Sequence, residues 1–339
     1  MFNKSYILDL TKEILSIDSP SGFTSKVTKR IEEEAKAYKL KTEYTKKGNL
    51  LVYMDGTGDS TLGITSHVDT LGLMVRSISD TTLKLTTIGG PIVPTLDGEY
   101  CKIYTRNSKI YTGTILSTSP AVHVYNDANS KIRNIDNIEV RIDEVIKNKE
   151  DIKALSIANG DFVCYDPKTE ITESGFIKSR FLDDKLSVAC IFGYIDYMQK
   201  NELKPKTNIV FIFSTYEEVG HGASFIPEVD EILACDMGCI GDDLDCNEYQ
   251  VSICAKDSSG PYNYEMTSKL IELAKKEKLD YAIDIYPFYG SDASAAMRAG
   301  NDAKHALIGP GVHASHGMER SHIDGVINTI KLMVAYTTK

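Results

Sequence analysis

The chain has 339 residues, of which 42% are hydrophobic and 25% charged, and these proportions exclude disordered, collagen-like and coiled-coil proteins. A formal net charge of −10 excludes a strongly basic surface, so we expect neither nucleic acid nor an anionic membrane as a main partner. No run of about 18 apolar residues is present to span a membrane, and seven scattered cysteines indicate reduced thiols and a cytoplasmic location.

The first part of the chain, residues 1–73, alternates predicted helices and strands. Apolar residues recur at helical spacing over 1–15 and 23–40, whereas short apolar runs predict strands over 50–54 and 62–66. A polar turn follows the second of these strands directly. This alternation is typical of an α/β domain.

Residues 74–166 have a different pattern, with β-rich runs separated by turn signals. Gly89-Gly90-Pro91 and Asp97-Gly98 are two of these signals. Several short strands at such spacing predict a small β-sandwich or barrel. We therefore expect residues 74–166 to form an inserted β-rich domain.

Helices and strands alternate again over residues 167–339. Helices are predicted over 184–199, 264–279, 291–299 and 323–337, and strands over 208–213, 232–235, 281–286 and 306–308. The run Asn208–Phe213 is continuously apolar and β-branched, as expected of a strand buried on both faces. Residues 1–73 and 167–339 together predict one α/β catalytic domain, interrupted by the insert.

Several familiar catalytic motifs are absent from the sequence. It contains neither a G-x-x-x-x-G-K-[ST] phosphate loop nor a strand-linked G-x-G-x-x-G. It also lacks the G-x-S-x-G elbow of serine hydrolases and the H-E-x-x-H zinc motif. Nucleotide binding and serine-hydrolase chemistry therefore have no support.

A set of polar residues instead follows the apolar strands or begins a helix, where open α/β sheets form their ligand sites. These residues are His67, Asp69, Asp183, Asp184, Glu217, Glu218, Asp236 and His316. Separate loops can bring such side chains to one place. Two histidines with three or more carboxylates are a fitting ligand set for paired zinc, cobalt or manganese ions.

The pair Glu217-Glu218 is the most informative part of this set. Two acidic residues directly after an apolar strand belong in a polar cleft or must be paired. Adjacent side chains on an extended segment point in different directions, so one can bind metal while its neighbour faces the substrate. The same geometry disfavours a glycosidase, whose two carboxyl groups face each other across one bond.

These residues also resemble a known family, the tetrahedral metallo-aminopeptidases of metallopeptidase family 42, which includes glutamyl and deblocking aminopeptidases. His67-Val68-Asp69 followed by Leu71–Val75 resembles their H-x-D-x-x-G-L-M-V segment, and Thr215–Gly220 matches T-x-x-E-E-V-G. Phe181–Lys185 resembles A-L-D-D-R, and Gly290–Ala293 resembles G-T-D-A. The order and spacing of the motifs agree over essentially the whole chain.

The resemblance implies a zinc-peptidase-like mixed sheet flanked by helices, with an inserted small β-barrel or sandwich (PDZ-like) domain. It also implies that this insert serves dimerisation or assembly into a homo-oligomer, typically a tetrahedral dodecamer. It implies two divalent metal ions per subunit, zinc or cobalt with manganese as a third candidate. The metal ligands it implies are His67, Asp183, Glu218, Asp236 and His316, with Asp183 bridging. Glu217 is then the general base, and Asp69 orients the imidazole of His67.

The segment around the last histidine departs from the family pattern R-Y-x-H-[ST]-P-x-E. Here it reads His313-Ala314-Ser315-His316-Gly317-Met318-Glu319-Arg320, without the Arg-Tyr pair and the proline. His313 is therefore an alternative to His316 as the ligand. Four residues are candidates for substrate binding, and they are Asp292, His313, Glu319 and Arg320.

Three functions remain open at this point. The first is a two-metal aminopeptidase that removes the N-terminal residue of short peptides. The second is a metal-dependent deacylase or amidase acting on an N-acylated amino acid or small peptide, which the altered segment around His316 suggests. The third is a catalytically silent, metal-stabilised assembly protein, against which the retained Glu217 argues because such a protein has no physical need of it.

Overall fold

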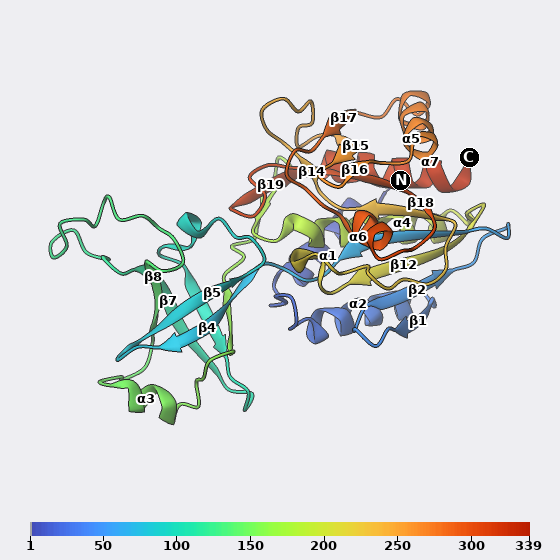
Figure 1. Ribbon diagram of the computed structural model, residues 1–339. Helices are drawn as coiled ribbons and strands as arrows, with labels where there is room; N and C mark the ends of the chain where they lie inside the picture. The colour runs from blue at the N-terminus through green and yellow to red at the C-terminus, as the bar shows by residue number, and fades with distance from the viewer. Residues whose placement is uncertain (1) are drawn as a thin grey trace. The chain divides into compact units, whose positions relative to one another are not determined.

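The computed structural model describes residues 2–339, which divide into two compact units (Figure 1). The first unit comprises the chain up to Asp69 together with Lys168–Lys339, and the second comprises Thr70–Pro167. Each unit is described by itself below. None of the helices described in residues 2–339 combines the length and the apolar character needed to cross a membrane.

A ten-stranded mixed sheet forms the centre of the first unit. The hydrogen-bonded path across it runs β1 (Lys41–Tyr44), β2 (Leu50–Met54), β12 (Asn208–Ser214), β3 (Thr61–His67), β13 (Glu231–Cys235), β18 (Lys304–Val312), β15 (Val251–Asp257) and β16 (Gly260–Pro261). Two further strands lie off this path, β14 (Gly238–Cys239) beside β18 and β17 (Tyr281–Ile285) beside β15. Strands β12, β3, β13 and β18 are mutually parallel, so their carboxyl ends share one edge.

Helices cover the faces of this sheet (Figure 1). They are α1 (Lys4–Leu15), α2 (Ser25–Ala37), α4 (Leu182–Lys200), α5 (Tyr264–Lys276), α6 (Asp292–Arg298) and α7 (Ile323–Thr338). Helix α4 is apolar around most of its circumference and is almost entirely buried, because it packs against β3 and between α1 and α7. The rings of Phe192 on α4 and Phe213 on β12 stack with centroids 5.6 Å apart.

The central strand β12 is buried on both faces, as its apolar run predicts. Its residues from Ile209 to Phe213 are at most 1% exposed. It pairs with β3 in parallel, with Ser214 opposite His67. The apolar pattern therefore fixes the position at which the polar residues after each strand emerge.

A small three-stranded sheet in the same unit was not predicted. It orders β10 (Glu170–Ile171), β11 (Phe176–Ser179) and β19 (Glu319–His322). Strands β11 and β19 pair antiparallel, with Ser179 opposite Glu319. This pairing brings the start of α4 next to the segment that carries His316, although more than a hundred residues separate them in the chain.

The second unit is a closed β-barrel, which confirms the predicted β-rich fold and selects the barrel over the sandwich. Its strands close in the order β4 (Gly72–Ile78), β5 (Thr82–Ile88), β8 (Ile138–Ile142), β7 (Ile110–Ser117), β6 (Tyr100–Tyr104) and β9 (Phe162–Tyr165). A 3-10 turn, η1 (Val93–Leu96), and a short helix, α3 (Lys149–Ala154), lie outside the barrel strands. Asn148 caps α3 by accepting from the main-chain N–H groups of Glu150 and Asp151.

Candidate active site

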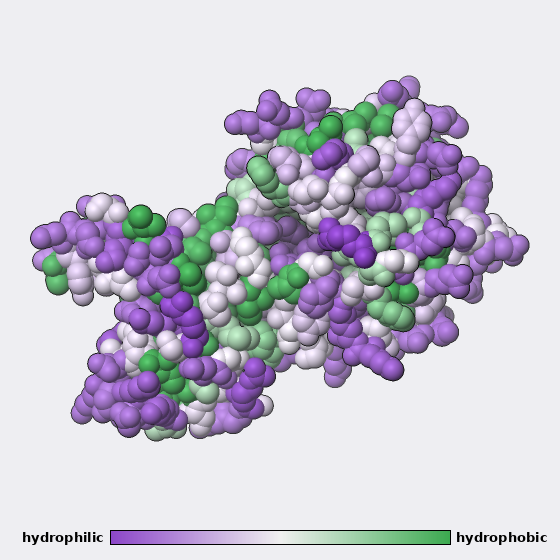
Figure 2. All heavy atoms as spheres, viewed as in Figure 1, coloured by the Kyte–Doolittle hydropathy of each residue, from purple (hydrophilic) through white to green (hydrophobic). Residues whose placement is uncertain are grey.

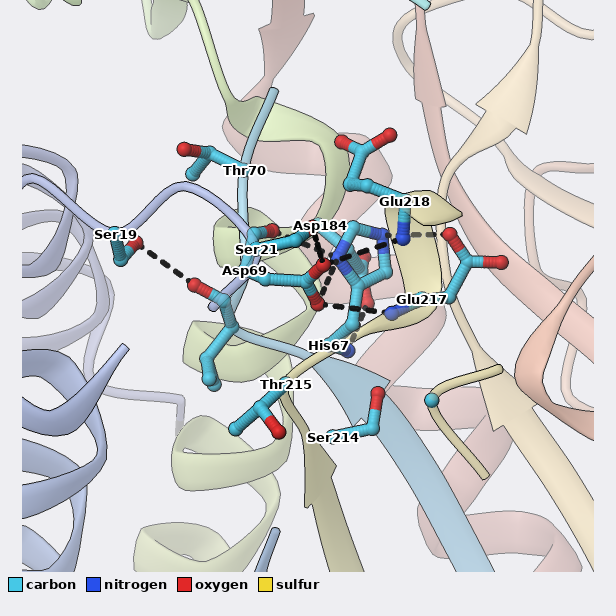
Figure 3. Close-up of polar contacts among 12 residues, drawn as sticks. Ser19, Ser21, His67, Asp69, Thr70, Asp184, Ser214, Thr215, Glu217 and Glu218 are labelled. Atoms are coloured by element: carbon cyan, nitrogen blue, oxygen red, sulfur yellow. Dashed lines mark hydrogen bonds and ion pairs between the residues drawn. The ribbon is translucent and has the colours of Figure 1, made fainter. Parts of the chain in front are cut away.

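The parallel strands deliver polar side chains to one edge of the main sheet (Figure 3). His67 ends β3, Asp236 follows β13, and Glu217 and Glu218 lie in the 3-10 turn η2 (Glu217–Val219) after β12. Asp183 is added from the start of α4. The sequence placed all five at strand or helix ends, and the fold brings them together.

His67 contacts two acidic side chains through one ring nitrogen. Its Nε2 lies 3.0 Å from Oδ1 of Asp183 and 3.8 Å from Oε2 of Glu217. Its Nδ1 lies 2.9 Å from the main-chain oxygen of Asp69, which favours a proton on Nδ1 and leaves Nε2 as the free coordinating nitrogen. The imidazole is thus aimed at the carboxylates.

His316 reaches the same cluster from the segment between β18 and β19. Its Nε2 lies 3.5 Å from Oδ2 of Asp183 and 3.6 Å from Oε2 of Glu218. His313, the alternative ligand, is exposed, and its main chain forms a bridge with Arg320. The geometry therefore favours His316 over His313 as a member of the cluster.

Two sets of ligand atoms within the cluster could each hold a metal ion. The atoms of His67, Asp183 and Glu218 all lie within 4.8 Å of one another, and so do those of His67, Asp184 and Asp236. Asp184 was in the predicted set of polar residues but not among the metal ligands that the resemblance implies. Its Oδ2 accepts from the Ser66 hydroxyl at 2.5 Å and from the main-chain N–H of His67 at 3.1 Å.

Asp69 organises the loop of the two glutamates more directly than it contacts the imidazole. Its carboxylate accepts from the main-chain N–H of Glu217 at 3.1 Å, from that of Glu218 at 3.2 Å, and from the Ser21 hydroxyl. The nearest carboxylate oxygen is 3.6 Å from Nδ1 of His67, and the main-chain oxygen makes the closer contact. Asp69 thus links the end of β3 to the loop that follows β12.

Glu319 plays a similar part on the other side of the cluster. Its Oε2 accepts from the main-chain N–H of Asp183 at 3.1 Å, and its Oε1 accepts from that of His316 at 2.9 Å. The side chain is only 2% exposed. Both oxygens are therefore engaged in holding two neighbouring segments together.

Asp292 and Arg320, two further candidates for substrate binding, make contacts within the protein. Asp292 is 3% exposed and accepts from the Ser214 hydroxyl at 2.5 Å and from the main-chain N–H of Ala223 at 2.8 Å. Arg320 lies 3.4 Å from Glu248 and places its guanidinium 4.5 Å from the ring centroid of Phe176. Their side chains therefore already have partners.

The crowding of negative charge changes the protonation of the glutamates. Burial raises the pKa of Glu217 well above its ordinary value, and the nearby charges of Asp236, Asp292 and Glu218 raise it further. Burial likewise raises the pKa of Glu218, with Asp183 adding to the effect. Without a cation, the ionised forms of these groups repel one another.

The two aspartates of the cluster shift in opposite directions. Burial works against ionisation of Asp183, but its contacts with His316 and His67 outweigh burial and hold its pKa below its ordinary value. Burial and the charge of Asp183 raise the pKa of Asp236 to about 7. A group of acids with such divergent pKa values is typical of a functional site.

The donor set fits divalent metal ions of the zinc type. Imidazole nitrogen and carboxylate oxygen are the ligands that zinc, cobalt and manganese accept. Within the described residues 2–339, the buried Oε1 of Glu218 and Oδ1 of Asp184 have no hydrogen-bond partner. Buried carboxylate oxygens without donors are costly in a protein and indicate a cation as their partner.

The supporting residues could not be identified from sequence patterns. Three serine hydroxyls donate hydrogen bonds to aspartates near the cluster: Ser66 to Asp184, Ser214 to Asp292 and Ser21 to Asp69. Ser66 and Ser214 both lie near the ends of the paired strands β3 and β12, one position out of register, and this placement is the signal that points to them. Serine is common at strand ends, and only the structure shows which carboxylate each one contacts.

A mixed α/β sheet that gathers histidines and carboxylates at its strand ends defines the class of metal-dependent hydrolases. Residues 48–332 match the M42 glutamyl aminopeptidase family, and the chain belongs to that family of metallopeptidases. It is accordingly an aminopeptidase, a hydrolase of peptide bonds.

Known proteins support this assignment over nearly the full length. The chain is 47% identical over 333 residues to a protein of Bacillus subtilis (strain 168) named putative aminopeptidase YhfE, a match covering 97% of this chain and 96% of that relative. Among solved structures, aminopeptidase APDkam598 from the archaeon Desulfurococcus kamchatkensis is 21% identical with a TM-score of 0.87, covering 99% of this chain and 95% of its own. The TET1 peptidase of Pyrococcus horikoshii is 22% identical with a TM-score of 0.86, covering 98% and 99%. These two structures show the shared fold.

Proposed function

We propose that the enzyme removes the N-terminal residue of short peptides with two divalent metal ions and with Glu217 as general base. His67, Asp183, Glu218, Asp236 and His316 would hold the ions, and Asp183 would be the ligand that the two ions share. One observation carries the proposal: Glu217 lies beside the cluster, 3.8 Å from His67 Nε2, but belongs to neither set of ligand atoms. A carboxylate in that place is free to accept a proton. His316 is also outside both sets, but its Nε2 lies 3.5 Å from Asp183 and 3.6 Å from Glu218, two carboxylates of the first set.

The chemistry then divides between the ions and the protein. Bound divalent ions polarise the scissile carbonyl and lower the pKa of water toward about 7. Glu217 accepts the proton of the attacking water at its carboxylate and delivers it to the leaving amine. Its raised pKa suits this exchange, because the group must both take up and release the proton. Asp69 holds the loop of Glu217 through its main chain, and Asp292 binds Ser214 and Ala223 on either side of that loop.

Glu217→Gln is the direct test of the base. The amide has nearly the same size but cannot accept a proton, so we expect kcat to fall by about 10²–10⁴-fold. Metal content and melting temperature should match those of the unchanged enzyme, because Glu217 lies outside both ligand sets. An active Glu217→Gln enzyme would rule out this role.

A panel of matched substrates separates aminopeptidase from deacylase activity. Free and N-acetylated aminoacyl substrates would be compared with added zinc, cobalt or manganese, and Glu217→Gln would serve as the blank. We expect turnover of the free-amino set only, because the chain belongs to an aminopeptidase family. Turnover confined to the acetylated set would make the enzyme a deacylase.

We further propose that the barrel unit drives self-association into a homo-oligomer, with a tetrahedral dodecamer as the expected form. The similar Pyrococcus horikoshii TET1 peptidase can assemble into a tetrahedron or a large octahedral shell. Exposed apolar side chains on the barrel unit include Tyr100, Val124, Ile132 and Val145, each more than 70% exposed. Apolar patches also interrupt the largely hydrophilic face in Figure 2. Such patches mark surfaces that another chain covers.

Light scattering tests the assembly. A dodecamer has about twelve times the mass of the 37.5 kDa chain, and charged substitutions at Val124 and Ile132 should lower the measured mass by electrostatic repulsion and desolvation. Val219, an exposed apolar residue of the first unit, provides the control substitution. A protein that stays monomeric before any substitution would contradict this part of the proposal.

The cysteines support a reducing, cytoplasmic location. Seven free cysteines are found among the described residues, and all but Cys239 are buried. Buried free thiols are typical of proteins from reducing compartments. Fractionation of cells that express a tagged chain would check the location, and recovery outside the cytoplasm would contradict it.

A further inference from the structure

The loop that carries Glu217 and Glu218 runs from Thr215 to Gly222, and a single side chain from elsewhere in the chain joins its two ends. Asn49 lies just before β2, at the turn that follows β1. Its Oδ1 accepts from the main-chain N–H of Thr215 at 3.2 Å and from the Thr215 hydroxyl at 2.9 Å. Its Nδ2 donates to the main-chain oxygen of Gly222 at 2.9 Å.

The side-chain amide of Asn49 accepts hydrogen bonds at its oxygen and donates one from its nitrogen. The carbonyl oxygen only accepts and the NH₂ group only donates, so the amide fits in one orientation. Asn49 is 0% exposed, and its main chain is fixed by hydrogen bonds with Thr45 in both directions. A fully buried amide that closes a loop in this way is a rigid support rather than a surface contact.

The same turn contacts the loop a second time through Lys47. Its Nζ donates to the main-chain oxygen of His221 and, at 2.7 Å, to the Ser224 hydroxyl. The far end of the loop is also closely packed, because a Cβ on Gly222 would lie 2.4 Å from Oδ1 of Asp292. The loop therefore has little room to relax once its ends are set.

The main chain in the middle of the loop is held by Asp69. Asp69 accepts from the main-chain N–H groups of Glu217 and Glu218. The contact with Asp69 fixes the position of the middle of the loop. The loop can still turn about that point unless its two ends, Thr215 and Gly222, are also fixed. Asn49 supplies the link between those ends.

We propose that Asn49 is a positioning residue for peptide hydrolysis, which holds Thr215 and Gly222 at a set separation and thereby fixes the direction of the Glu217 carboxylate. The inference rests on the proposed role of Glu217 as general base. Asn49 itself would touch neither the substrate nor the reacting atoms. Its effect is on kcat, through the geometry of proton transfer.

Asn49→Ala in the full-length, metal-loaded enzyme is the test. Because small displacements of a catalytic group can cost about 10²-fold in rate, we expect kcat to fall by about 10- to 100-fold while KM changes by less than about 3-fold. Asn49→Asp keeps the acceptor toward Thr215 but sets an oxygen against the Gly222 carbonyl. It should lose kcat to a similar extent.

Asn208 offers a matched control on the opposite end of β12. Its Oδ1 accepts from the main-chain N–H of Gly56 at 3.0 Å, and its Nδ2 donates to the main-chain oxygen of Gly58 at 3.2 Å. Asn208→Ala therefore removes the same kind of bridge without touching the site. It should lower the melting temperature and leave kcat within about 2-fold of the unchanged enzyme, as expected for a change far from the chemistry.

The outcomes distinguish the two proposals. If Asn49→Ala retains kcat as Asn208→Ala does, while Glu217→Gln is inactive, only the role of Asn49 is overturned. If Glu217→Gln keeps full activity, the proposed function fails and this inference fails with it.

Should Asn49→Ala not fold, Thr215→Val removes one of the three hydrogen bonds of the Asn49 side chain with little change in shape. A kcat loss of about 3-fold or more at unchanged KM would then support the role, and no loss would overturn it.

Discussion

Glu319 holds together two of the segments that form the cluster of histidines and carboxylates. Its two oxygens accept from the main-chain N–H groups of Asp183 and His316, which lie on different segments. Burial raises its pKa to about 8, and the charge of Asp183 contributes in the same direction. Its negative charge therefore depends on positive charge nearby, which bound cations would supply.

Glu319→Gln is expected to weaken metal binding by about 10–100-fold, as the loss of groups that orient metal ligands does. The amide keeps one acceptor but turns an NH₂ group toward the second N–H, so one of the two segments loses its anchor. Titration of the metal-free enzyme with zinc would measure the change. Glu231→Gln is the control, because Glu231 accepts from the Tyr336 hydroxyl at the other end of β13. Equal affinities in the two variants would count against the role of Glu319.

The sequence indicated which residue types gather at the site but not these supporting contacts. His67, Glu217 and Asp236 could be predicted because each follows an apolar strand. Glu319 was expected to face the substrate, and its contact with Asp183 spans 136 residues. The hydrophobic periodicity of a sequence describes one element at a time. It therefore does not predict hydrogen bonds between residues that are so far apart in the chain.

Among the elements, β18 closely approaches Asp236, the residue that follows β13. The main-chain N–H of Asp236 donates to the oxygen of Ile308 at 3.0 Å. A Cβ placed on the next residue, Gly309, would lie 1.4 Å from the main-chain oxygen of Asp236. The absence of a side chain at Gly309 is thus a condition for the position of Asp236.

Gly309→Ala should therefore disturb both stability and activity. We expect the free energy of unfolding to fall by about 2–3 kcal/mol, as overpacking of a close-packed site does, together with a loss of metal affinity because Asp236 must move. Urea denaturation and metal titration would measure the two effects. In Gly241→Ala the new methyl group meets no atom within 4 Å and should change neither quantity. Similar behaviour of the two variants would show that β18 can shift freely.

Element prediction succeeded where the apolar pattern was continuous. The run Asn208–Phe213 corresponds to β12, and the predicted helix over 184–199 corresponds to α4. Strand β15 was missed because Ser252 and Lys256 interrupt its apolar residues, and only its pairing with β17 and β18 makes it a strand. Short strands such as β11 and β19 owe their conformation to tertiary pairing in the same way.

For the molecule as a whole, the cluster concentrates negative charge inside a chain that already carries a net charge of −10. Buried carboxylates with raised pKa values oppose folding when they must ionise. A cation bound only by the folded state stabilises it by mass action. The stability of this enzyme should therefore depend on its metal.

Removal of metal with a chelator should lower the melting temperature. Ligand at about 100 times its dissociation constant contributes about 2.7 kcal/mol to the folded state, so a shift of several degrees is expected in calorimetry. Re-addition of zinc should restore the original value. Asp236→Asn should show a smaller chelator effect, whereas Glu217→Gln should show the full effect because it leaves both ligand sets intact. A melting temperature unaffected by chelator would contradict a structural contribution from the metal.

The course of the chain at Asp69 has a consequence for how such enzymes can diversify. Asp69 ends the N-terminal segment of the first unit, Thr70 begins the barrel unit, and the first unit resumes at Lys168, well before Asp183. Every residue assigned a chemical role above belongs to the two outer segments. The stretch 70–167 therefore supplies none of these residues. A different insert spliced at the same two junctions could give a lineage a new architecture, while the catalytic residues that flank it remain unaltered.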